Sequence, residues 1–190
     1  MMKKKVGLLG GTFNPPHMGH LVIAEQVLEK AQLDEIRFLP NHVPPHKQVD
    51  ERVTVDQRLW MLEAAIKGHP RFSIERIELE RQGASFTYDT IKLLMEREVN
   101  TEFSFIIGGD MIEYLPKWYK IEELQNMVKF IGVNRPDYPH ETSFNVQLIE
   151  VPAIDLSSSY IRDTVNKGQT VRYLVPDDVY RFIKEEKLYE

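Results

Sequence analysis

The sequence predicts an α/β fold, with an open, mostly parallel sheet, helices on both faces and a C-terminal helical segment. Short apolar runs typical of buried strands alternate along the chain with longer amphipathic runs at helical spacing. Two of the strand-like runs lead straight into paired glycines, Gly10-Gly11 and Gly108-Gly109. Because a strand, a helix and a second strand in succession form a right-handed parallel crossover, repeated units of this kind predict a parallel sheet.

The first such unit occupies the N-terminal fifth of the chain. Residues 6–9 form an apolar run that predicts the first strand. After the glycine turn, a helix is predicted from apolar residues at helical spacing: Leu21, Ala24, Leu28 and Ala31. The bulky segment 35–40 ends in a proline and predicts the second strand.

The middle of the chain predicts two further helices and a strand. Thr54 and Gln57 have the spacing of a capping box, and the helix they open should bury Leu59, Leu62 and Ile66. Residues 71–80 alternate imperfectly, which favours a strand with a bulge near Glu75 and Arg76. A third helix is predicted to open at Thr87 and Asp89 and to bury Ile91, Leu94 and Met95.

The remaining residues complete the predicted fold. Strands are expected at 103–107, 128–133 and 146–151, and a helix is expected to begin at the serines that end with Ser159. A last helix should begin near Pro176 and dock through Val179, Phe182 and Ile183. At 190 residues, the chain predicts a single Rossmann-like domain spanning residues 1–190.

Composition excludes several classes of function. Acidic residues outnumber basic ones, 29 to 24, and the basic run Lys3-Lys4-Lys5 stands alone, so no nucleic-acid partner is expected. The absence of cysteine excludes disulfides and thiolate metal sites. The apolar stretch after the lysines is too short for a signal peptide or a membrane span, so we expect a cytoplasmic protein without a membrane partner.

The glycine turn between residues 10 and 20 is the strongest candidate for a functional site. A strand, a glycine turn and a helix N-terminus aim backbone N–H groups and the positive end of the helix dipole at one point, which suits phosphate. His17 and His20 stand three apart, so their imidazoles should project from one side of the first helical turn. The spacing matches neither the dinucleotide fingerprint nor the P-loop. The alternative is an ordinary histidine pair at a helix cap.

Three other stretches carry chemistry at predicted strand or helix ends. His46 and Lys47 lie in a proline-stiffened loop that either reaches phosphate or is simply solvated. Asp110 can accept hydrogen bonds from ribose or stand near a metal ion, and the alternative role of helix N-cap is compatible with either. Arg162 follows serines at a helix start, where a guanidinium can meet phosphate oxygens in pairs. The aromatic pair Trp118-Tyr119 is interpreted on composition as core packing rather than a ligand platform.

Together these stretches resemble the bacterial nicotinate-nucleotide adenylyltransferases. Their wider superfamily of nucleotidyltransferases shares an H-x-G-H core, here His17-Met18-Gly19-His20, and a serine-rich motif that ends in arginine, here Ser158-Ser159-Tyr160-Ile161-Arg162. The Pro-Pro-His-Lys loop that ends at Lys47 resembles a feature of fewer members of the superfamily than these two motifs do. Ser159 stands where threonine is commoner in the family motif, but it keeps the hydroxyl.

The resemblance implies roles for individual residues. Catalysis would rest on His17, His20 and Arg162. The ATP-binding residues would be Gly10, Gly11, Thr12, Phe13, Asn14, His17, His20, Gly108, Asp110, Asn134, Arg135, Ser158, Ser159 and Arg162. The residues around nicotinate mononucleotide would be Asn41, His46, Lys47, Ser85, Thr87, Trp118 and Tyr119, with Trp118 as a stacking surface for the pyridine ring.

The implied reaction joins nicotinate mononucleotide to the AMP part of ATP, with Mg²⁺ bound mainly through the ATP phosphates. No protein metal ligands are assigned, and the sequence allows a homodimer. Other acceptors remain open within the superfamily, namely phosphopantetheine and nicotinamide mononucleotide. Two alternatives from other classes are a catalytically silent nucleotide sensor, which the intact histidines oppose, and an RNA-binding relative of synthetase domains, which the acidic balance opposes.

Overall fold

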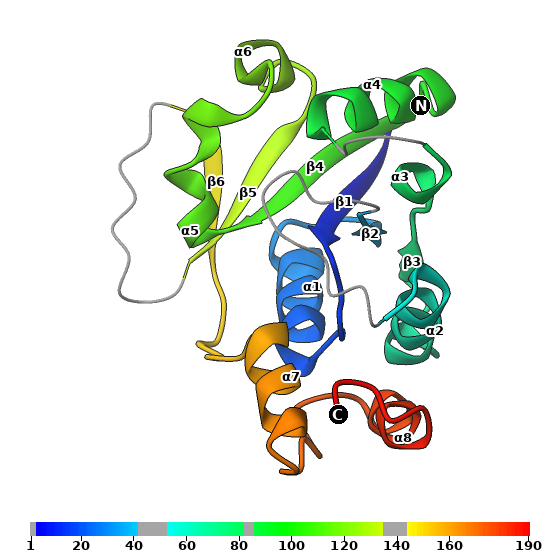
Figure 1. Ribbon diagram of the computed structural model, residues 1–190. Helices are drawn as coiled ribbons and strands as arrows, with labels where there is room; N and C mark the ends of the chain where they lie inside the picture. The colour runs from blue at the N-terminus through cyan, green and yellow to red at the C-terminus, as the bar shows by residue number, and fades with distance from the viewer. Residues whose placement is uncertain (1–2, 42–52, 82–85, 135–143) are drawn as a thin grey trace.

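The computed structural model describes residues 3–41, 53–81, 86–134 and 144–190. Within these residues, six strands form one sheet in the order β3-β2-β1-β4-β5-β6, and every neighbouring pair is parallel (Figure 1). The strands are β1 (Lys4–Gly11), β2 (Glu35–Pro40), β3 (Phe72–Ile74), β4 (Thr101–Gly108), β5 (Lys129–Asn134) and β6 (Val146–Glu150). The predicted open, parallel α/β sheet is therefore confirmed. The strand order reverses at β1, where doubly wound sheets open a ligand crevice at their carboxyl ends.

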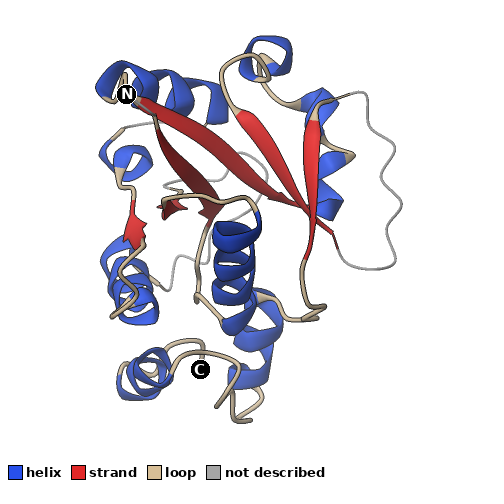
Figure 2. Cartoon of the chain, turned by 180° about the vertical axis from the view of Figure 1, so that it is seen from behind, coloured by secondary structure: helices blue, strands red, loops and turns tan. Residues whose placement is uncertain are grey.

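Helices cover both faces of the sheet (Figure 2). One face carries α1 (Met18–Lys30) and α2 (Val55–Ile66), and the other carries α4 (Thr87–Arg97), α5 (Gly109–Ile112), the 3₁₀ turn η1 (Leu115–Lys117) and α6 (Ile121–Leu124). Alternation along β1 explains the division: Leu8 packs in the cluster of α4, while its neighbour Leu9 packs in that of α1.

The C-terminal segment adds α7 (Ser158–Asn166) and α8 (Asp177–Glu185). Both helices share an apolar cluster with Met61 of α2, in which Ile161, Val179 and Ile183 are buried. Figure 1 shows α7 beside the beginning of α1, at the edge of the sheet where β1 ends. This packing brings the C-terminal segment to the glycine turn.

Several predicted elements are confirmed closely. The second strand occupies the predicted residues, Glu35–Pro40. Thr54 caps α2 by accepting a hydrogen bond from the backbone N–H of Gln57, and the Gln57 side chain accepts from the backbone N–H of Thr54. Ser157 caps α7, and Pro176 immediately precedes α8. No described helix is long and apolar enough to cross a membrane.

Two predictions in the middle of the chain were wrong. The strand predicted over 71–80 ends at Ile74, because the Glu75 carboxylate pairs with Arg37 and Arg97 and the chain then forms the single helical turn α3 (Ile77–Glu80). The buried positions of α2 are Arg58, Met61 and Leu62, whereas Leu59 and Ile66 are only partly buried.

Smaller corrections concern the other helices. Met95 on α4 is exposed, whereas Thr90 is buried and its hydroxyl donates to Glu78 at 2.9 Å. Leu21 on α1 and Ala31 at its C-cap, like Phe182 on α8, are partly buried rather than fully buried.

Candidate active site

The turn after β1 is shaped around a buried aromatic ring. Phe13 has a φ of 49°, in the left-handed region that non-glycine residues rarely adopt. Its ring packs edge-on against Phe38, with centroids 5.7 Å apart, and against His20 at 5.0 Å. A Cβ on Gly11 would lie 3.0 Å from the Phe13 ring, so glycine allows the ring to fold back under the turn.

The two histidines meet where α1 begins. His17 is the N-cap residue and His20 is the third helical residue, and their rings stack with centroids 3.7 Å apart. The prediction that both rings lie on one side of the first turn is therefore confirmed. The backbone N–H of His17 donates to Nδ1 of His20 at 3.2 Å, so the ring proton of neutral His20 lies on Nε2, where it can donate to a ligand.

Burial keeps both imidazoles uncharged. Burial lowers the pKa of His17 to about 4, and burial together with repulsion from His17 lowers the pKa of His20 well below its usual value. Nδ1 of His17 is buried and has no hydrogen-bond partner among the described residues. At neutral pH the pair is thus a set of neutral ring donors and acceptors at a helix N-terminus, which is the positive end of the helix dipole.

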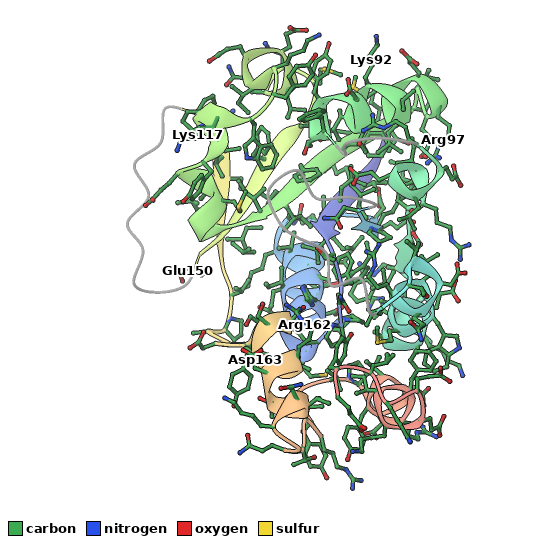
Figure 3. All side chains as sticks on the ribbon, in the orientation of Figure 1. Lys92, Arg97, Lys117, Glu150, Arg162 and Asp163 are labelled. Atoms are coloured by element: carbon green, nitrogen blue, oxygen red, sulfur yellow. The ribbon has the colours of Figure 1, made fainter. Side chains whose placement is uncertain are left out.

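The C-terminal motif contacts this turn directly. The Ser158 hydroxyl donates to the backbone oxygen of Pro15 at 2.8 Å. Arg162 donates through Nη1 to the backbone oxygen of Asn14 at 2.9 Å and through Nη2 to the hydroxyl of Ser159 at 3.1 Å. Figure 3 shows Arg162 where α7 meets the beginning of α1. The structure therefore brings together two of the motifs that the sequence singled out.

A buried arginine, which sequence reasoning missed, ties the turn to the end of β2. Arg58 is 2% exposed, and its Nη1 donates to the backbone oxygens of Thr12, at 2.9 Å, and Asn41, at 3.0 Å. Asn41 also donates its backbone N–H to the backbone oxygen of Gly11 at 3.1 Å, so it lies beside the turn. The only signal in the sequence was a charged residue next to the apolar stripe of a helix.

A cavity of about 310 Å³ opens beside His17. It lies between the start of α1, the ends of β4 and β5, and the segment after β6, the edge at which parallel sheets bind ligands. Its lining is mostly apolar and consists of His17, Gly19, Ile23, Gly108, Gly109, Val133, Val151, Pro152, Ile154 and Leu156. His17 and Gly108 were predicted, but residues 151–156 were missed, although their position after the last strand was a signal for the same edge.

Three of the residues predicted for the pyridine nucleotide lie on other elements. Trp118 is half-buried, and its ring packs edge-on against Phe105 and Phe130 with centroids 5.8 and 6.0 Å apart, so the packing interpretation is confirmed for Trp118 but is wrong for the exposed Tyr119. Tyr119 is exposed and contacts Phe86 at 5.0 Å, next to Thr87 at the start of α4. Lys120 lies over the Tyr119 ring at 5.5 Å. Thr87 therefore follows directly a residue that contacts Tyr119.

The remaining predicted site residues are described in part or not at all. Asp110 belongs to α5 and Asn134 ends β5, both at the carboxyl edge of the sheet. Ser85, Arg135, His46 and Lys47 lie outside the described residues. No cluster of three or more His, Asp or Glu side chains suited to hold a metal ion occurs within the described part of the chain.

Comparison with known proteins identifies the class. Residues 8–164 match the family model described as cytidylyltransferase-like, a range that runs from the second half of β1 through the turn and the other strands to the Arg162 motif. With an open parallel sheet and paired histidines at the first strand end, the chain is a nucleotidyltransferase.

Curated relatives identify the family more narrowly. A nicotinate-nucleotide adenylyltransferase of Bacillus subtilis is 48% identical over 187 residues, covering 98% of this chain and 99% of that one. A probable nicotinate-nucleotide adenylyltransferase of Geobacillus thermodenitrificans is 54% identical over 185 residues, covering 97% and 86%. The chain belongs to the nicotinate-nucleotide adenylyltransferase family.

A solved structure shares the fold at low sequence identity. The Plasmodium falciparum nicotinic acid mononucleotide adenylyltransferase complexed with NaAD is 22% identical, has a TM-score of 0.82, and covers 98% of this chain and 97% of that one. At this identity the likeness supports the fold alone.

Proposed function

We propose that this protein transfers the adenylyl group of ATP to nicotinate mononucleotide, giving nicotinate adenine dinucleotide and pyrophosphate. One nucleotidyltransferase domain spanning residues 1–190 would perform the reaction, in the cytoplasm. The observation that carries the proposal is the convergence of the His17–His20 pair and Arg162 on one turn at the end of β1. Relatives named nicotinate-nucleotide adenylyltransferase or probable nicotinate-nucleotide adenylyltransferase are about half identical to this chain over nearly its full length, and they support the choice of acceptor.

The chemistry requires alignment rather than proton removal. A phosphate oxygen of the mononucleotide attacks the α-phosphorus of ATP, a new P–O bond forms, and the bond from the α-phosphorus to the bridging oxygen breaks as pyrophosphate leaves. The attacking oxygen is already anionic, so no residue need deprotonate it. Catalysis then consists of holding the two nucleotides in line and stabilising charge on the transferred and leaving phosphates.

The residues around the turn suit this task. Nε2–H of His20 and the N-terminus of α1 offer donors to phosphate oxygens. Arg162 uses one N–H of each terminal nitrogen within the protein, so the other N–H groups of its guanidinium are available to a phosphate. Because His17 and His20 are neutral, they add hydrogen bonds without placing further charge in a buried site.

The described residues supply no carboxylate cage for a metal ion. Mg²⁺ keeps much of its hydration shell, so it would be held by the ATP phosphates and water rather than by a dedicated protein site. When bound, it neutralises charge on the phosphates. The side chains around the turn then act on the remaining charge.

The acceptor pocket should distinguish nicotinate from nicotinamide. A carboxylate needs facing donors, and Thr87, which follows the Tyr119 contact residue Phe86, offers a hydroxyl at the start of α4. The amide of nicotinamide would direct its own N–H groups at such donors, leaving buried groups unpaired at roughly 1–3 kcal/mol each. Nicotinamide mononucleotide and phosphopantetheine are therefore the rival acceptors to test.

A pyrophosphate-release assay tests the proposal. The wild-type protein should release pyrophosphate only when ATP and nicotinate mononucleotide are both present. H20A should abolish most of this release. H69A is the matched control and should retain it, because His69 lies between α2 and β3 and pairs with Glu25 of α1. Release that does not depend on any acceptor, or none at all from the folded wild type, would refute the proposal.

A further inference from the structure

The segment after α8 returns to the phosphate-binding turn. Tyr189 is 2% exposed, and its hydroxyl donates to Oδ1 of Asn14 at 2.6 Å. Asn14 is itself 3% exposed. A contact across 175 positions of the sequence thus joins the last described segment to the turn that follows the first strand.

This contact fixes the Asn14 side chain within the turn. Arg162 already holds the backbone oxygen of Asn14 at 2.9 Å. The side-chain amide is planar, so holding Oδ1 also fixes the direction of its NH₂ group. With both its backbone and its side chain held, Asn14 has one orientation between β1 and α1, and the Tyr189 hydroxyl is what sets the side-chain part of it.

The tail is held in place firmly enough to act in this way. The backbone N–H of Leu188 donates to Ile183 at 3.0 Å, and Nδ2 of Asn166 donates to the backbone oxygen of Tyr189 at 3.4 Å. Tyr189 has a φ of 69°, a conformation that costs a non-glycine residue free energy. Burial of its ring in the apolar cluster of α7 and α8 offsets that cost.

A second buried group supports the turn from the side of β2. Arg58 holds the backbone oxygen of Thr12, two residues before Asn14, at 2.9 Å. Burial lowers the pKa of the Arg58 guanidinium, and the nearby Tyr189 phenol opposes that effect. The two side chains therefore lie close enough to interact electrostatically, and both are held against the turn.

We propose that Tyr189 is a positioning residue for ATP, which acts by holding the Asn14 side chain in the phosphate-binding turn. The inference rests on the proposed function, because Asn14 affects turnover only if this turn binds ATP. Tyr189 need not touch the nucleotide. Loss of its hydroxyl should therefore change the KM for ATP and leave the KM for nicotinate mononucleotide unchanged.

The test removes only the hydroxyl. In Y189F the KM for ATP should rise roughly tenfold, as expected for one lost hydrogen bond to a buried polar group, while the KM for nicotinate mononucleotide stays within about twofold. Y173F deletes a hydroxyl from a tyrosine that is 78% exposed, and it should match the wild type in both constants. Thermal unfolding of both variants checks the fold.

A double mutant separates positioning from general support. If Tyr189 acts through Asn14, the variant N14A/Y189F should have the same KM for ATP as N14A, because N14A already removes the contact through which the hydroxyl acts. Independent, multiplying effects would overturn the inference. So would a wild-type KM for ATP in Y189F, equal rises in both KM values, or loss of the fold at the assay temperature. Turnover by the wild type shows separately whether the proposed function stands.

Discussion

Replacing Arg162 with lysine tests the junction between the C-terminal motif and the turn. The substitution keeps the positive charge but removes the planar group that serves two acceptors at once, the backbone oxygen of Asn14 and the hydroxyl of Ser159. A lysine ammonium can reach one of them or the phosphate, but it cannot reproduce the fork. One lost charge-assisted hydrogen bond is worth roughly 1.5–3 kcal/mol, so kcat/KM should fall about 10- to 100-fold.

The assay is steady-state pyrophosphate release with ATP varied at saturating nicotinate mononucleotide. R172K provides the control, because Arg172 is exposed and lies over the Tyr173 ring rather than at the turn. The control should match the wild type. If R162K kept kcat/KM within about threefold of the wild type, paired recognition by the guanidinium would be refuted.

Three further predictions follow from the same structure. H17A and H20A should each lower kcat/KM about 100-fold or more without unfolding the protein, which is the effect expected when one hydrogen-bond donor to the transition state is lost. Wild-type turnover in either variant would show that the histidine is not part of the catalytic site. Burial lowers the pKa of His17 from 6.5 to about 4, so as the pH falls the His17 imidazole takes up a proton in the unfolded chain before it does so in the folded protein. The urea concentration at the unfolding midpoint should therefore drop as the pH falls from 6.5 to about 4. The drop should be less steep in H17N. T54A should lower the free energy of unfolding by about 1 kcal/mol through loss of the α2 cap, as measured by urea unfolding. An unchanged midpoint would show that the Thr54 cap does not stabilise the protein.

The parts of the fold that the sequence predicted well depend on local signals. The bounds of β2 follow from a bulky run stopped by Pro40, and the start of α2 follows from the capping residues Thr54 and Gln57. The errors occurred where distant partners decide the structure. The chain leaves the sheet at Glu75 because Arg37 and Arg97 bind its carboxylate, and neither contact is visible in a local pattern.

The site shows the same division between local and long-range information. The stacking of His17 and His20 follows from their spacing on one helical turn. The burial of Arg58 could not be predicted, because a charged residue is ordinarily placed on the solvent side of a helix. Tyr189 was missed for a different reason: its partner Asn14 lies 175 positions away, and only the packing of α8 against α2 and α7 brings the two together.

Product identity tests the central claim most directly. The wild-type protein is given ATP with nicotinate mononucleotide, nicotinamide mononucleotide and phosphopantetheine in competition, and the products are identified by mass spectrometry. Nicotinate adenine dinucleotide should predominate, by roughly a hundredfold over the nicotinamide product if two buried pairings distinguish the rings. Comparable amounts of both dinucleotides would contradict the carboxylate pocket, and a predominant phosphopantetheine product would contradict the proposed acceptor itself.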